Sequence, residues 1–518
     1  MNPTQNKPVP STSRRIAVNT LSLYFRMLFL LVVSLYANRI VLAELGAEDF
    51  GIYNVVGGIV PILLFITTAL ANATQRFFNV EIGKGGDLTS LRKVFATTCF
   101  INLVLMVIVV LLSETLGLWF VNHCMNFRPE RMTSVNWVYQ FSVINCIPGI
   151  LFASYFSSII CHEHMKIFAG LSVFEAVIKL AFVFALPYIP SMKLEFFTLM
   201  VFAVGCFQQL FYILYSRRHF AECRQLNFRL VDRESLRGVL GFTSWTVLGV
   251  LDTIVHTQGI GILVNIFFGT VVNAAYGIAN QMNTVVKRFI QSFMTAFMPH
   301  VVKSFAAGNR SEMHEYILRG CRIAFVLVSV IVIPLIIETP KVMSIWLREV
   351  PEYAIIFVRL VLLVTLVDST SDLLTASIGA TGRIKWYNIV ITAIGLLHVV
   401  LTYILYYLGY PPYSAMYVYI GVVFVMSVGR FWFNVRGVGL PVRGILMQYV
   451  VRGGGFFVLA VLLSWCLHLW LSDGRILCAL LVCVFSVVCT LILASLLVLL
   501  PTERRAIIRL VHTKVLKK

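Results

Sequence analysis

Residues 22–40 read SLYFRMLFLLVVSLYANRI, an apolar run long enough to cross a membrane as a helix. Arg26 is the exception within it. A guanidinium near the bilayer centre costs at least about 2.5 kcal/mol on insertion scales, so it needs water, a partner or a function there. The run is also much longer than the core of a signal peptide, which predicts an uncleaved first span.

The whole chain shares this apolar character. It has 518 residues, of which 59% are hydrophobic and 13% charged, and its mean hydropathy is +0.87. Such values are typical of a polytopic membrane protein. At roughly 20 apolar residues per span, the sequence predicts an all-α protein with about fourteen transmembrane helices. The loops between the expected spans are too short to hold a soluble catalytic domain.

The basic residues indicate topology. The chain has 42 Lys and Arg against 23 Asp and Glu, a net charge of +19. They are spread among short loops instead of forming one patch with aromatic residues, so we expect no nucleic-acid partner. Placing the N-terminus in the cytoplasm puts most of them on the cytoplasmic side, including the arginines of 217–237 and the basic tail. Both termini are therefore predicted to be cytoplasmic.

Several motifs of enzymes and metal proteins do not occur. The eleven cysteines form no CxxC pair and no cluster with His at metal-ligand spacing, and most lie inside apolar runs, as small buried hydrophobes do. We find no phosphate-binding glycine loop and no nucleophile elbow. We therefore expect no enzyme, no bound metal and no ATP-driven motor.

Two parts of the chain resemble each other. LGAEDFGIYNVV at Leu45 is followed by TALANATQRFF, and FGTVVNAAYGIANQM at Phe268 is followed by TAFMPHVVKSF, at an offset of about 225 residues. Shared membrane composition is the alternative explanation. If the repeat is real, it predicts an N-lobe of six spans (1–216), a cytoplasmic linker (217–237), a C-lobe of six spans (238–435), and two further helices with a basic tail (436–518).

Polar residues form stripes on two expected spans. The second span carries Asn54, Gly58, Pro61, Thr68, Asn72 and Gln75 at helical spacing, and the eighth carries Asn280, Thr284, Lys287, Gln291 and Thr295. Packing between helices explains such stripes without any function. Lys287 and its neighbour Arg288 favour a wet cavity instead, because packing alone needs no charge. For Arg26 a structural ion pair is the alternative to a cavity-lining cation.

Three acidic residues are also expected within spans, namely Asp252, Asp368 and Asp372. Two carboxylates four residues apart, as Asp368 and Asp372 are, repel each other unless a cation, a proton or a basic neighbour intervenes. They are therefore candidates for binding Na⁺ or H⁺. Pairing with Arg359 or Arg430 is an equally good alternative.

Several segments resemble bacterial polysaccharide and O-antigen flippases of the Wzx type, members of the multidrug/oligosaccharidyl-lipid/polysaccharide (MOP) exporter superfamily. The segments are NTLSLYFRMLFLLVVSLYANRIVLAELGAEDFGIYNVVGGIV, ATQRFFNVEIGKGG, QGIGILVNIFFGTVVNAAYGIANQ, VKSFAAGN and ATGRIKWYN. The resemblance covers most of residues 15–435, whereas 436–518 match only in hydropathy.

This resemblance implies two six-helix lobes in a MATE-like V around a central cavity, with alternating access. It also implies a flippase of the bacterial inner membrane. The cargo would be undecaprenyl-diphosphate-linked oligosaccharide, moved from the cytoplasmic to the periplasmic leaflet for lipopolysaccharide and polysaccharide biosynthesis. An ion gradient or the membrane potential would drive it, with Na⁺ or H⁺ as coupling ion and no other cofactor. Membrane lipids and a polysaccharide polymerase or chain-length machinery are candidate partners.

The resemblance also implies roles for residues. The cations that could line the cavity are Arg26, Arg76, Lys287 and Arg288, and the groups that could bind sugar are Asn54, Asn72, Asn280 and Gln291. Asp252 is the first choice for a coupling-ion site, with Asp368 and Asp372 as further candidates.

Two other functions are alternatives. A MATE-type cation-coupled antiporter of drugs or other small molecules would favour acidic groups in its cavity over these basic ones. An O-antigen polymerase or ligase would show a long periplasmic loop with paired Arg or His, and the expected periplasmic loops are short. The balance of charge among the spans therefore favours the flippase.

Overall fold

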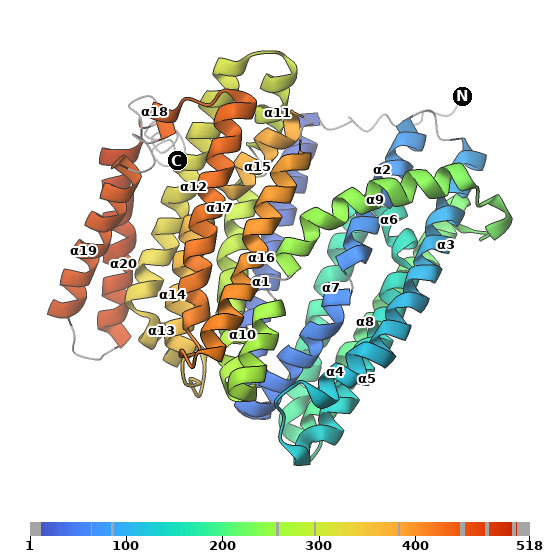
Figure 1. Ribbon diagram of the computed structural model, residues 1–518, viewed down its shortest axis with the longest axis horizontal. Helices are drawn as coiled ribbons and strands as arrows, with labels where there is room; N and C mark the ends of the chain where they lie inside the picture. Colours follow the sequence, from blue (N-terminus) through green and yellow to red (C-terminus); the bar gives the residue numbers. More distant parts are fainter. Residues whose placement is uncertain are drawn as a thin grey trace, which may run out of the picture. The chain divides into compact units, whose positions relative to one another are not determined.

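The computed structural model describes residues 12–499 and 504, apart from 64, 84–86, 163, 255–257, 295–296, 382–383, 446–450 and 472–475. These described residues form helices joined by short turns and contain no strand (Figure 1). The prediction of an all-α membrane protein is confirmed.

Among the described residues, eleven helices are long and apolar enough to cross a membrane, and a twelfth span results if the bent pair at Pro129–Leu151 and Ala153–Cys161 is one span. The predicted count of fourteen is not confirmed. The second and the seventh expected spans are not among these helices. Each of the two crosses a break in the described residues, at 64 and at 255–257.

The chain forms two compact units. Unit 1 comprises 1–46, 66–118 and 133–243, and unit 2 comprises 47–65, 119–132 and 244–518. The division of the chain into two lobes, a linker and a C-terminal part stays a prediction. The helices of unit 1 are the first part of α1 (Thr12–Leu63), α2 (Phe65–Gly83), α3 (Leu88–Leu112), α5 (Met132–Leu151), α6 (Ala153–Cys161), α7 (Met165–Ala185), α8 (Lys193–His219) and the start of α9 (Arg233–Ile254).

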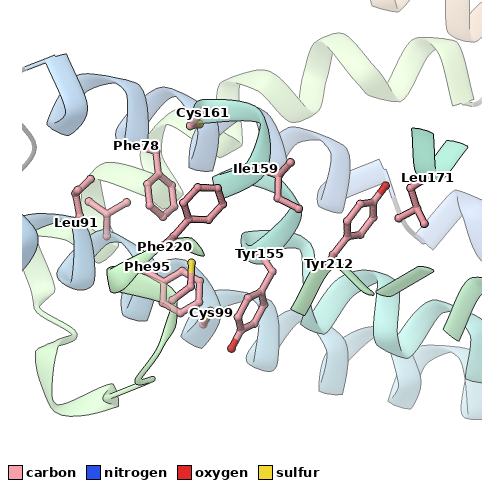
Figure 2. Packing of buried hydrophobic residues seen from close by; sticks show 12 residues of the cluster. Phe78, Leu91, Phe95, Cys99, Tyr155, Ile159, Cys161, Leu171, Tyr212 and Phe220 are labelled. Carbon is pink, nitrogen blue, oxygen red and sulfur yellow. The ribbon is translucent and has the colours of Figure 1, made fainter. Parts of the chain in front are cut away.

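The core of unit 1 includes residues that follow α8 as well as helix residues (Figure 2). Phe95 of α3 meets the ring of Tyr155 of α6 edge to face, with 5.0 Å between the ring centres. Phe220 and Cys223, from the start of the segment between α8 and α9, are buried in the same cluster. This segment is therefore fixed to unit 1 by apolar packing as well as by the chain.

Unit 2 contains the rest of α1 and α9 and most of the remaining helices. These are α4 (Leu118–His123), α10 (Ile260–Met294), α11 (Met298–Ala306), α12 (Arg310–Ile337), α13 (Thr339–Trp346), α14 (Ala354–Asp368), α15 (Ser371–Ala380), α16 (Lys385–Tyr407), α17 (Ser414–Val438), α18 (Val442–Ile445), α19 (Gly454–Trp470) and α20 (Ile476–Leu493). α14 packs on α10 and α17, while α19 and α20 lie side by side against α12 (Figure 1).

Two glycines break long helices in the same way. Gly46 in α1 has φ 77° and ψ 172°, and Gly269 in α10 has φ 80° and ψ −171°. Only glycine adopts this region of backbone conformation without strain. Gly46 and Gly269 occupy matching places in the two similar sequences, so the shared break supports the internal repeat.

Candidate functional site

One carboxylate bridges two cations inside unit 2. Asp368, the last residue of α14, accepts a hydrogen bond from Lys287 Nζ at 3.0 Å through Oδ2 and one from Arg430 Nη1 at 2.9 Å through Oδ1. The side chains are 32% exposed for Lys287, 18% for Asp368 and 11% for Arg430. We call these three residues the ion triad.

The ion triad joins α14 to the two helices that pack on it, α10 and α17. α14 ends at Asp368 and α15 begins at Ser371, so the span is interrupted at the carboxylate. The last carbonyl groups of a helix carry partial negative charge and attract cations. The interruption therefore favours placing Lys287 and Arg430 at this end of α14.

Polar side chains continue from the ion triad along neighbouring turns. Thr365, one turn before Asp368, donates a hydrogen bond to Asn283 Oδ1 at 2.5 Å. The hydroxyl groups of Thr375 and Tyr387 are 2.6 Å apart. A polar group that stays unpaired in an apolar environment is costly, so these pairs make the polar region stable inside the membrane.

Asn434 holds the backbone that carries Arg430. It is fully buried one turn later on α17, and its Nδ2 donates to the carbonyl oxygen of Leu374 at 3.0 Å. The hydroxyl of Ser377 donates to its Oδ1. These bonds fix α17 against α15, so the position of the guanidinium does not depend on Asp368 alone.

The charges of the ion triad decide which ligands it can take. Two cations share one carboxylate, and Asp372 lies one turn beyond Asp368 within electrostatic reach of both cations. Both oxygens of Asp368 already accept a hydrogen bond from a cation. An added metal cation would have to displace Lys287 or Arg430, whereas an anion could compete with Asp368 for Lys287, the most exposed of the three.

Of the two pairings considered for Asp368, the one with Arg430 is present. Arg359 instead donates its Nε–H to the carbonyl oxygen of Ile336 at 3.0 Å. The assignment of Asp368 and Asp372 to ion coupling stays a prediction. Asp252 lies in α9, but its side chain is outside the described residues.

Two of the predicted cavity residues make contacts within their own unit. The Asn54 amide donates to the carbonyl oxygen of Phe50 at 2.7 Å, and the side chain packs so closely on Gly277 that a Cβ there would lie 3.0 Å from it. The Arg76 guanidinium lies 4.3 Å from the centre of the Phe242 ring. Asn54 thus contributes to helix packing, and its role in sugar binding stays a prediction, as does that of Arg76.

The polar stripe of α10 divides into two faces. One face carries Lys287 and Asn283, whose side chains bond to Asp368 and Thr365 of α14. The other face carries Thr284, Arg288 and Gln291, which are exposed. Asn280 is half-buried. The side chains of Arg26 and Asn72 lie outside the described residues, so their predicted roles stay predictions.

Sequence reasoning did not single out Asn283 or Tyr387, and it considered Arg430 only as a partner for an acid. Asn283 lies four residues before Lys287, which places both on one helix face, so the spacing could have identified it. No local signal marks Tyr387 or Arg430, because the contacts that define them come from distant parts of the chain.

A metal centre is a further candidate for such a polar region. Among the described residues no group of three or more His, Cys, Asp or Glu side chains is arranged to hold a metal ion. The ion triad itself offers one carboxylate with both oxygens engaged.

Comparison with known proteins extends these observations. Residues 255–404 match the MatE family model, a region that includes Lys287 and Asp368. No curated protein matches the sequence.

Several solved structures share the fold. The structure of the lipid II flippase MurJ in an inward closed conformation is 13% identical, with a TM-score of 0.67 over 93% of this chain and 98% of MurJ. An inward-facing multidrug resistance MATE family transporter of the MOP superfamily is 13% identical, with a TM-score of 0.63 over 79% of this chain and 98% of its own. A MOP superfamily transporter from Pyrococcus furiosus, described as having a binding pocket of reverse polarity, is 14% identical, with a TM-score of 0.55 over 80% of this chain and 96% of its own. At these identities the likeness shows the fold.

Proposed function

We propose that this protein is a flippase that moves undecaprenyl-diphosphate-linked oligosaccharide from the cytoplasmic to the periplasmic leaflet of the bacterial inner membrane, for lipopolysaccharide and O-antigen type polysaccharides. The match to the lipid II flippase supports this proposal, because it leaves 7% of the chain unmatched. The match to the inward-facing MATE family transporter covers less of the chain, 79%.

The observation that carries the proposal is the ion triad. A diphosphate head group cannot cross hydrocarbon without compensating cations, because an unpaired charge there costs many kcal/mol. Lys287 is bound to Asp368 but remains 32% exposed. In the proposed mechanism Lys287 leaves Asp368 for a phosphate oxygen of the cargo, and Arg430 keeps the carboxylate compensated meanwhile.

Exchange of this kind explains why a carboxylate lies between two cations. Asp368 stands in for the cargo's anionic group when no cargo is bound, so the cations need not be solvated in an apolar span. A proton or Na⁺ acting at Asp252 or Asp372 would couple the exchange to an ion gradient. The oligosaccharide would be bound by Asn280 and Gln291 of the same helix, α10.

A MATE-type antiporter of cationic drugs is the second candidate. The match of residues 255–404 to the MatE family model favours it. A site for a cationic drug needs a carboxylate that is free to pair with the drug. Because Asp368 is held by two cations, the geometry favours an anionic cargo.

Reconstituted transport separates the two candidates. Proteoliposomes with a fluorescent undecaprenyl-diphosphate oligosaccharide would be compared for wild type, Lys287→Gln and Lys385→Gln, with imposed pH and Na⁺ gradients. Lys385 is an exposed lysine at the start of α16 in the same unit. We expect flipping by wild type and Lys385→Gln and at least a tenfold loss in Lys287→Gln, about 1.4 kcal/mol in the barrier. Export of cationic dyes without flipping would support the antiporter and reject the flippase.

A further inference from the structure

The segment between α8 and α9 has a buried side and an exposed side. We call residues 217–237 the basic linker; the structure describes all of them. Phe220, Glu222 and Cys223 are buried in unit 1. Leu226 and Phe228, only a few residues later, are 39% and 44% exposed. The buried residues hold the basic linker in place, and its apolar side chains still face outward.

The exposed side of the basic linker is strongly positive. Two of its three acidic residues are paired: Glu222 Oε1 is 2.7 Å from His162 Nε2, and Asp232 Oδ2 is 3.3 Å from Lys93 Nζ. Glu234 is the exposed acidic residue of this segment. The exposed basic residues are Arg217, Arg218, Arg224, Arg229, Arg233 and Arg237. The segment therefore presents six arginines against one carboxylate.

The packing of Phe228 indicates how deep the basic linker lies in the membrane. Its ring meets that of Phe100 on α3, with 6.1 Å between the ring centres. Phe100 is the first member of an exposed apolar stripe that runs along α3 through Val104, Val107, Ile108 and Leu111. In a multi-pass membrane protein such a stripe faces acyl chains. Phe228 therefore lies at the end of a lipid-facing surface.

The charged residues of α3 agree with this depth. Arg92 and Lys93 lie about two turns before Phe100, or roughly 10 to 12 Å along the helix. Two such charges fit the level of the lipid headgroups, and the contact with Phe100 then puts Phe228 up to this distance toward the acyl chains. Interfacial segments bury their apolar side chains about 5–10 Å into the boundary between headgroups and acyl chains.

We propose that the basic linker binds the headgroups of anionic phospholipids, with Leu226 and Phe228 inserted between the acyl chains and the arginines on the phosphates. Its apolar side chains continue a lipid-facing stripe, and its arginines lie where anionic headgroups would be. A soluble anionic partner would gain nothing from Phe228 at this depth. The basic linker thus fastens the segment between the two sequence repeats to the membrane surface. This inference needs no assignment of the cargo.

Hydrogen exchange of the full-length protein in nanodiscs tests the inference. The probes are phosphatidylcholine alone and phosphatidylcholine mixed with phosphatidylglycerol. We expect amides 224–231 to exchange several-fold more slowly in the anionic mixture, and this difference to disappear in Phe228→Ser. Tyr188→Ser is the matched control, since Tyr188 is an 87% exposed aromatic residue beyond the other end of α8. It should leave the difference unchanged.

Lipid retention gives a second measurement. Native mass spectrometry of the purified protein measures how much phosphatidylglycerol it retains. We expect the affinity for this lipid to fall about fivefold for each arginine removed, as in Arg224→Gln and Arg229→Gln. Inorganic phosphate should not reproduce the protection of 224–231. Equal exchange in the two nanodiscs, or protection of these amides by phosphate alone, would overturn the proposal.

Discussion

The contribution of each residue of the ion triad to stability depends on the other two residues. Asp368 is 18% exposed and Arg430 11% exposed, inside a span. Removing one member of such a buried pair leaves an uncompensated charge, whereas removing both charges can be almost neutral. The stability of the ion triad is therefore not the sum of its two hydrogen bonds.

Asp368→Asn should lower the free energy of unfolding by about 3 kcal/mol, because it leaves Lys287 and Arg430 facing each other without a carboxylate. Asp368→Asn combined with Arg430→Met should recover part of this loss. Thermal unfolding in detergent measures both. Arg436→Gln on the same helix is the control, since Arg436 is exposed against Trp432 and its loss should cost less than about 1 kcal/mol. Equal losses in Asp368→Asn and Arg436→Gln would show that the triad does not stabilise the fold.

Glu222 of the basic linker predicts a pH dependence. Burial alone would raise the pKa of its carboxyl, but the hydrogen bond with His162, its own backbone amide and nearby Arg92 outweigh burial and hold the pKa below its usual range. The folded state therefore gains stability that is complete above the unfolded pKa of about 4.3 and is lost as pH falls through the lower folded value. In His162→Gln this loss on the acid side should shrink. Melting temperatures between about pH 3 and 5 measure it, and an unchanged slope would contradict the pairing.

At the scale of helices, α1 and α10 of unit 2 approach each other closely at Gly51. A Cβ on Gly51 would lie 2.0 Å from the carbonyl oxygen of Thr270, which is impossible without a shift of the backbone. Gly57, farther along α1, has no atom within 4 Å of such a Cβ. The two glycines thus differ in whether the neighbouring helix leaves space for a side chain.

Gly51→Ala should destabilise the protein by about 1–3 kcal/mol, because the backbone of α10 has to move away. Gly57→Ala should be neutral or stabilise it slightly, since alanine favours a helix where space permits. Thermal unfolding of the two variants gives the comparison. A Gly51→Ala variant as stable as Gly57→Ala would show that these helices are not in contact.

Sequence patterns predicted single helices far better than contacts between them. Apolar runs predicted the helices, and the polar stripe on α10 marked Lys287 as a candidate for the cavity. Its partner Asp368 lies 81 positions away, and periodicity says nothing about contacts at that distance. Asn283 could have been predicted from the same helical spacing as Lys287. The interruption of α14 at Asp368 falls in the polar run 368–372, although both of its carboxylates were expected to lie within a span.

Across the whole chain, the pairing of basic residues with acids differs between the two predicted sides of the membrane. At the end predicted to be periplasmic they are paired with acids: Lys193 with Glu44 at 2.8 Å, and Arg128 with Glu48 at 3.3 Å. The six exposed arginines of the basic linker, predicted to be cytoplasmic, are accompanied by one exposed carboxylate, that of Glu234. The bias of basic residues toward the cytoplasm is therefore sharper in net charge than in residue counts.

This asymmetry predicts an orientation that labelling can check. A cysteine replacing Tyr188 should react with a membrane-impermeant maleimide in intact cells, whereas one replacing Gln225 should react only after permeabilisation. The two residues lie beyond opposite ends of α8 and are both exposed, so their accessibility differs only by the side of the membrane. Wild type gives the background from the eleven native cysteines. Labelling of position 225 from outside would place the basic linker in the periplasm and reverse the direction of transport proposed for the whole molecule, because the exposed arginines would then face the wrong leaflet.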